Sequence, residues 1–87
     1  MATVVLPRSL VALFPGIERR WVVPGATVAE VIAALEERVP GMADRLLAGG
    51  PDIRAHLNVF VDGERAGLAS PVGPDALVHV IPAVSGG

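Results

Sequence analysis

The end of the sequence carries the clearest chemical pattern, because Ser85, Gly86 and Gly87 follow an apolar run that Pro82 interrupts. Glycine has no side chain and broad backbone freedom, so such a tail could thread a narrow channel and present a terminal carboxylate inside another protein. A carboxylate is a poor electrophile until it is activated, and adenylation would supply a leaving group. A sulfur nucleophile could then displace AMP and leave a thiocarboxylate on Gly87.

The two final glycines are weak evidence when taken alone. The chain has 10 glycines in 87 residues. A terminal Gly-Gly pair therefore arises by chance about once in 75 sequences of this composition. Many domains also end in a short tail of small residues. The pattern gains weight only if the elements before it form a domain whose last strand leads into the tail.

The residues needed for other common chemistries are missing or isolated. The sequence has no Cys, and its seven basic residues are all Arg. Disulfides, thiolate metal sites, a cysteine nucleophile and Schiff-base chemistry on lysine are therefore excluded. His56 and His79 both fall in predicted strands, and we interpret them as structural or surface residues. We expect no catalytic residue, no metal site and no bound cofactor.

The composition predicts one globular domain, since 87 residues with 52% hydrophobic content leave no room for a second. The net charge of −2, the scattered arginines and only three aromatic residues argue against nucleic-acid binding. No apolar stretch approaches the roughly 20 residues of a membrane span. The first residues lack the pattern of a secretory signal, so we expect a cytoplasmic protein.

The segment that begins at Thr27 has the clearest helical pattern. Thr27 and Glu30 have the spacing of a capping box, in which the Thr27 hydroxyl accepts from the Glu30 N–H and the Glu30 carboxylate accepts from the Thr27 N–H. Pro40 and Gly41 end the helix, and Glu36 is expected to face away from the core. The apolar stripe consists of Val28, Val31, Ile32, Leu35 and Val39.

The remaining segments are predicted mainly as strands. Apolar runs bounded by turn residues predict strands at 3–6, 17–23, 56–61, 64–65 and 77–81. Asp62 and Gly63 form the strongest short hairpin signal, between the third and fourth of these strands. Residues 8–16 are predicted to form a loop, and residues 42–47 a short helical turn. Alternation in the second strand places Ile17, Trp21 and Val23 on one face.

The order of strand, strand, helix and further strands predicts an α+β domain in which one main helix packs on a mixed sheet of four or five strands. This is the β-grasp, or ubiquitin-like, arrangement. The first and last strands are short and apolar, so they are candidates for the centre of the sheet, where they could pair in parallel. We expect a domain over residues 1–84 and a flexible tail over residues 85–87.

Two segments resemble the MoaD/ThiS superfamily of sulfur carriers. They are residues 57–64, LNVFVDGE, and residues 78–87, VHVIPAVSGG. The similarity covers nearly the whole chain, and the Pro-x-Val-x-Gly-Gly ending is its most specific part. The length and the connection at 40–55 look closest to the cysteine-biosynthetic carriers, and then to the small subunit of molybdopterin synthase. Asp62 stands where Asn is common in this family.

The resemblance implies a protein co-substrate rather than an enzyme. An E1-like adenylyltransferase/sulfurtransferase would use ATP to activate the Gly87 carboxylate, with Gly86 and Ser85 threading its channel. The Gly87 thiocarboxylate would then give its sulfur to a synthase, either cysteine synthase-like or the large subunit of molybdopterin synthase. Two alternatives remain open. The chain could be a ubiquitin-like modifier that is joined to lysines through Gly87, or a β-grasp interaction subunit whose tail is inert.

Partner contacts are expected on the sheet face opposite the helix. Alternation in the last strand places Val78 and Val80 inward, under the helix, and His79 and Ile81 outward. The candidate contact residues are Ile81, His79, Val84, Arg65, Val5 and Pro7.

Overall fold

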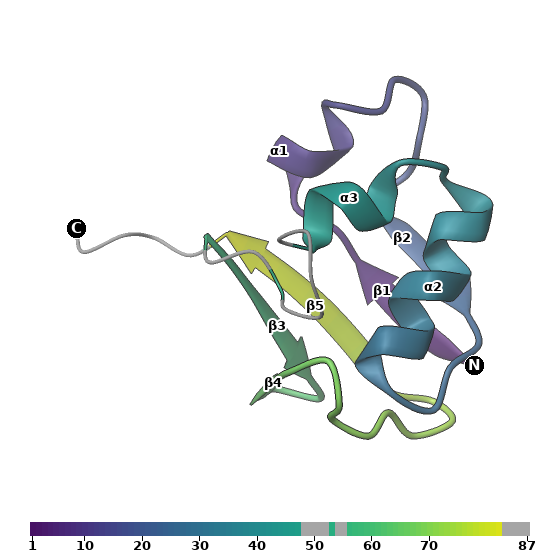
Figure 1. Ribbon diagram of the computed structural model, residues 1–87, viewed down its shortest axis with the longest axis vertical. Helices are drawn as coiled ribbons and strands as arrows, with labels where there is room; N and C mark the ends of the chain where they lie inside the picture. Colours follow the sequence, from purple (N-terminus) through teal and green to yellow (C-terminus); the bar gives the residue numbers. More distant parts are fainter. Residues whose placement is uncertain (48–52, 54–55, 83–87) are drawn as a thin grey trace.

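The computed structural model describes residues 1–47, 53 and 56–82 (Figure 1). Its elements are β1 (Ala2–Val5), α1 (Arg8–Val11), β2 (Arg20–Val23), α2 (Val28–Arg38), α3 (Met42–Leu46), β3 (Leu57–Val61), β4 (Glu64–Ala66) and β5 (Leu77–Pro82). The strands form one sheet in the order β2-β1-β5-β3-β4. Helix α2 lies over one face of this sheet (Figure 1). The predicted β-grasp fold is therefore confirmed.

The first and last strands meet at the centre of the sheet, as their apolar sequences predict. β5 pairs in parallel with β1 through residues 77–79 and antiparallel with β3 through residues 78–82. The other two pairs, β1 with β2 and β3 with β4, are antiparallel. The chain therefore leaves the sheet after Pro82 from its middle strand and not from an edge.

Helix α2 begins at the predicted cap. The Glu30 N–H donates to Thr27 Oγ1 at 3.2 Å. The Glu30 carboxylate accepts from the Ala26 N–H at 3.0 Å, so the predicted bond to the Thr27 N–H is wrong by one residue. Thr27 is extended and forms a β-bridge with Pro71, and the carboxylate reaches past it to the preceding N–H.

The core lies between α2 and the sheet. The predicted stripe of α2 is confirmed, since Val28, Val31, Ile32 and Leu35 are all buried. They pack against inward-facing strand residues such as Val4 and Val78, each 2% exposed. No polar or charged residue is buried in the part of the chain that the structure describes. Burial of this apolar surface is the main term that stabilises the domain.

Residues 8–16 are not a plain loop as predicted, because residues 8–11 form the single turn of α1. Leu10 and Val11 each donate a backbone N–H to the Pro7 carbonyl at 3.1 Å, and Leu10 is buried. Strand β2 starts at Arg20 and not at residue 17. β1 ends opposite Arg20, and the Ile17 N–H donates instead to the Phe14 carbonyl.

The hairpin between β3 and β4 follows the sequence prediction. Asp62 and Gly63 have φ values of 50° and 87°, which is the backbone of a type I′ turn. The Asp62 side chain also accepts from the Leu77 N–H at 2.9 Å, while its own N–H donates to the Leu77 carbonyl. Asp62 therefore ties the hairpin to the start of β5.

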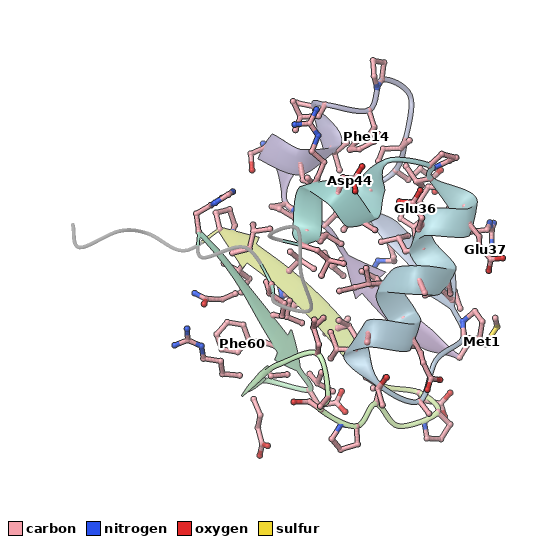
Figure 2. All side chains as sticks on the ribbon, in the orientation of Figure 1. Met1, Phe14, Glu36, Glu37, Asp44 and Phe60 are labelled. Carbon is pink, nitrogen blue, oxygen red and sulfur yellow. The ribbon has the colours of Figure 1, made fainter. Side chains whose placement is uncertain are left out.

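The predicted helical turn after α2 is confirmed as α3, and its N-terminus is capped by a distant side chain. Gly41, at the N-cap position, has a φ of 96° and offers no capping side chain. Glu36 of α2 instead accepts from the N–H groups of Gly41 and Ala43, both at 2.8 Å. These two bonds lower the pKa of Glu36 below its ordinary value. Figure 2 shows Glu36 at the end of α2 that adjoins α3.

Candidate functional site: the open sheet face and the root of the tail

Among the described residues, no helix or strand packs over the sheet face opposite α2, and we call it the open face. Its residues alternate along each strand with the buried ones, so their positions follow from the strand pairing. Figure 2 shows Phe60 beside β3, on the side away from α2. The open face consists of Thr3, Val5, Arg20, Val22, Asn58, Phe60, Arg65, Leu77, His79 and Ile81.

One row of side chains crosses all five strands of the open face. Val5 pairs with both Arg20 and His79, and Phe60 pairs with both His79 and Arg65. Neighbouring strands lie about 4.8 Å apart, so the backbones of Arg20 and Arg65, at the two ends of this row, lie about 19 Å apart. An apolar and aromatic centre is thus flanked by a guanidinium at each edge of the sheet.

The charge of the open face is opposite in sign to that of the whole chain. Its described residues include two arginines and one histidine but no Asp or Glu, although the net charge of the chain is −2. Glu64 pairs with Val61, on the other face. Two large apolar side chains at the sheet's edge and centre, Val22 and Ile81, are 52% and 37% exposed. This face suits a protein partner that is apolar at its centre and acidic at its rim.

The structure orients most of the predicted contact residues as expected. Ile81 is exposed and His79 half-buried on the open face, while Val78 and Val80 are buried under α2. Val5 and Arg65 also lie on the open face. Whether these residues contact a partner stays a prediction.

Pro7 is an exception among the predicted contact residues, because it is buried. Strand β1 ends at Val5, and Pro7 lies beyond it as the N-cap residue of α1. Its backbone φ of −73° and its carbonyl, which accepts from α1, direct it into the domain. Alternation along β1 cannot be extended to a residue that has already left the strand.

A groove lies at the end of the sheet where β5 stops, and we call it the tail-root groove. Its lining includes Ser9 and Leu10 of α1, Leu13, Arg45 of α3, His56 and Pro82. Figure 1 shows α1, α3 and the end of β5 at the same end of the molecule. The groove has a volume of about 340 Å³. No pattern in the sequence predicts this groove, because its residues come from four separate segments.

His56 lies outside its predicted strand, whereas Trp21 lies on its predicted face. His56 precedes β3 and is an exposed turn residue, because β3 starts at Leu57 opposite Pro82. Trp21 is half-buried on the predicted face, with the Arg38 guanidinium 5.5 Å from its ring centre. Just before β2, the Arg19 Nε donates to the Leu6 carbonyl at 2.9 Å.

Neither a metal-binding cluster nor a membrane-spanning helix is found among the residues that the structure describes. In residues 1–47, 53 and 56–82, no group of three or more His, Cys, Asp or Glu side chains could hold a metal ion. Among the same residues, no helix is long and apolar enough to cross a bilayer. The predicted acceptor Gly87, the threading residues Gly86 and Ser85, and Val84 lie outside the described part of the chain.

The family of the chain follows from comparison with known proteins. The ThiS family model matches residues 10–87. The chain belongs to the ThiS family. Small archaeal modifier protein 3 of Haloferax volcanii is 35% identical to this ThiS-family protein over 66 residues, which is 71% of each chain. The resemblance to the MoaD/ThiS superfamily is thereby confirmed.

Solved structures agree with this assignment over the full length of the ThiS-family fold. A chain of the Amycolatopsis orientalis BexX/CysO complex has a TM-score of 0.87 and 32% identity, and the match covers 100% of both chains. Mycobacterium tuberculosis CysO has a TM-score of 0.86 and 28% identity, covering 97% of this chain and 100% of its own. SAMP1 from Haloferax volcanii has a TM-score of 0.76 and 28% identity, covering 99% and 98%. The protein is thus a small ubiquitin-like carrier or modifier.

Proposed function

We propose that this protein is a sulfur carrier whose Gly87 carboxylate is adenylated by an E1-like partner and converted to a thiocarboxylate. The observation that carries the proposal is the extent of the family match, which includes Gly86 and Gly87. The protein acts as a co-substrate of its partner enzymes and contributes no catalytic residue of its own. The tail, residues 83–87, supplies the reacting group and the domain supplies the recognition surface.

The chemistry requires two substitutions. A Gly87 carboxylate oxygen attacks the α-phosphorus of ATP, the bond to the bridging oxygen breaks, and pyrophosphate leaves. The acyl adenylate is a good electrophile because AMP is a good leaving group. Hydrosulfide then attacks the carbonyl carbon, AMP departs, and loss of a proton leaves the thiocarboxylate. No oxidant or reductant is needed when the nucleophile is hydrosulfide.

The position of the tail root suits this role. β5 ends at Pro82 in the middle of the sheet. Five residues can span at most about 17 Å, so the Gly87 carboxylate acts within that distance of Pro82. A side chain at either of the last two positions would widen the tail, whereas Gly-Gly passes through the narrowest channel.

The open face supplies the surface on which the partners dock. Its apolar centre, with Phe60 and Ile81, would be covered on binding, and Arg20 and Arg65 would meet acidic side chains at the rim. Aromatic residues and arginines are enriched in protein interfaces for these reasons. The likeness to two chains named with CysO supports a cysteine synthase-like acceptor over the large subunit of molybdopterin synthase.

Intact-mass spectrometry tests the proposal. The protein is incubated with the purified E1-like adenylyltransferase from the same genome, ATP and sulfide. Its mass should then show one oxygen replaced by sulfur, and fragmentation should place the change in the C-terminal fragment that contains Gly87. Two matched controls, one lacking Gly87 and one with an alanine added after it, should keep their masses. An unchanged wild-type mass, with an enzyme that activates another ThiS-family carrier, would contradict the proposal.

The name of one relative favours a second candidate function, the conjugation of Gly87 to target lysines, because that relative is called a modifier protein. Conjugates isolated from cells would distinguish the two functions. Arg65 is the last arginine of the sequence and there is no lysine, so trypsin would leave residues 66–87 as a branch on the modified lysine. Such branched peptides, lost when Gly86 and Gly87 are deleted, would favour the modifier. A thiocarboxylate without branched peptides would favour the carrier.

A further inference from the structure

The tail-root groove combines apolar and basic side chains at the point from which the tail departs. Leu10 and Leu13 come from the β1–β2 connection, and Pro82 ends β5. Leu13 is 52% exposed and adds apolar surface to the groove. Arg45 and His56 are both exposed, and no acidic residue is among the described residues that line the groove.

The length of the tail brings any enzyme that acts on Gly87 against this groove. The enzyme's reacting atoms must come within about 17 Å of Pro82, since five residues reach no further. A standard interface covers about 800 Å² on each partner, which is a disc of roughly 16 Å radius. An interface of that size around the tail root therefore includes the tail-root groove together with the end of β5.

The activating enzyme depends on this surface more than the sulfur acceptor does. An acceptor can select its substrate by the thiocarboxylate, which is chemically distinct from every ordinary chain end. The activating enzyme meets an unmodified carboxylate, which any protein C-terminus offers. Its selectivity must therefore come from the surface of the domain around the tail.

We infer that the tail-root groove is the site at which the E1-like activating enzyme recognises this chain, through an apolar side chain seated against Leu10, Leu13 and Pro82 and a carboxylate paired with Arg45. This inference rests on the proposed function. It adds a second docking element to the open face, at the edge where the tail enters the enzyme. Complementary charge at such a rim speeds association and excludes wrong partners.

Steady-state ATP–pyrophosphate exchange tests this site. The carrier is titrated against the E1-like adenylyltransferase from the same genome, and KM and kcat are measured for the wild type, Leu13→Asp and Arg45→Glu. Each groove variant should raise the KM for the carrier about tenfold and change kcat less than twofold, because the tail and its carboxylate are unaltered. Arg38→Glu, a charge reversal on an exposed residue of α2, is the matched control and should change KM less than twofold.

Two further measurements make the result specific. Circular dichroism melting establishes that each variant is folded, and Arg45→Gln replaces Arg45→Glu if the latter is not. Added salt should raise the KM of the wild type more than that of Arg45→Gln, because the pair with Arg45 is present to be screened only in the wild type.

The outcomes separate the groove from the proposed function. Folded groove variants with the wild-type KM would overturn the recognition site while leaving sulfur carriage intact. A groove variant with a lower KM would also overturn it. A wild-type protein that supports no exchange, with an enzyme that activates another ThiS-family carrier, would overturn the proposed function and the groove with it.

Discussion

Three glycines of this domain differ in what a single added methyl group would meet. At Gly25, a Cβ would lie 2.7 Å from Val31 Cγ2 and 2.7 Å from the Val31 backbone nitrogen, and φ is +154°. At Gly63, φ is +87° but no atom lies within 4 Å. At Gly67, no atom lies within 4 Å and φ is not in the left-handed range. Alanine at these positions therefore separates steric overlap from backbone strain.

The expected losses of unfolding free energy follow from these two effects. Gly25→Ala combines backbone strain of about 1–3 kcal/mol with overpacking of about 1–3 kcal/mol, a total of roughly 2–6 kcal/mol. The overlap cannot be relieved by a rotamer change alone, since the backbone nitrogen of α2 is one of the atoms involved. Gly63→Ala suffers strain only, about 1–2 kcal/mol. Gly67→Ala is expected to be neutral or to stabilise by up to about 1 kcal/mol.

Urea unfolding followed by circular dichroism measures all three variants against the wild type. The expected order of stability is Gly67→Ala, then Gly63→Ala, then Gly25→Ala, with equal m-values if the unfolded states are alike. A Gly25→Ala protein as stable as Gly67→Ala would refute the reasoning, because the approach of residue 25 to the first turn of α2 could then not be as close as described.

Three more predictions address the helix caps and the open face. Thr27→Ala should lower the unfolding free energy by about 1 kcal/mol in urea titrations, since it removes the N-cap bond of α2. Glu36→Gln should be less stable than the wild type at neutral pH. The N–H groups of Gly41 and Ala43 lower the pKa of Glu36 from its ordinary 4.5. The Glu36 carboxylate therefore contributes fully to the unfolding free energy above about pH 4.5. As the pH falls through the lowered pKa of the folded state, the contribution is lost and the two proteins should converge in acid urea titrations; a constant gap would contradict the assignment. Ile81→Glu should leave stability within about 0.5 kcal/mol. It should weaken binding to the activating enzyme about tenfold by calorimetry, and unchanged binding would exclude this part of the open face.

The features predicted correctly from the sequence are those set by neighbouring residues. The stripe of α2 and the Thr27 cap depend on spacings of three and four residues, and the Asp62-Gly63 turn on two. The inward and outward residues of β5 follow from strict alternation within one strand. The diglycine pattern and the family resemblance were also visible in the sequence, and together they identified the candidate chemistry.

The features that were missed depend on contacts between distant segments. Glu36 faces away from the core as expected, but its cap on α3 was missed, because the turn at Gly41 folds the next helix back onto it. Pro7 was expected on the open face, but α1 begins there and buries it. The tail-root groove is assembled from α1, α3, the turn before β3 and the end of β5. No periodicity within one segment reports such an assembly.

The central position of β5 links the fold to the proposed chemistry. When an enzyme binds the tail in a channel, any force on the tail also acts on β5, the strand from which the tail continues. An edge strand held by one ladder could fray under such a load, since local opening starts where backbone bonds are fewest. β1 pairs with residues 77–79 of β5 and β3 with residues 78–82, so the end that bears the tail is held by β3, and Val78 and Val80 anchor the strand under α2. If the proposed function is correct, a load on the tail is borne by the β3 ladder and by the buried side chains of β5, and we expect the domain to stay folded while the tail is engaged.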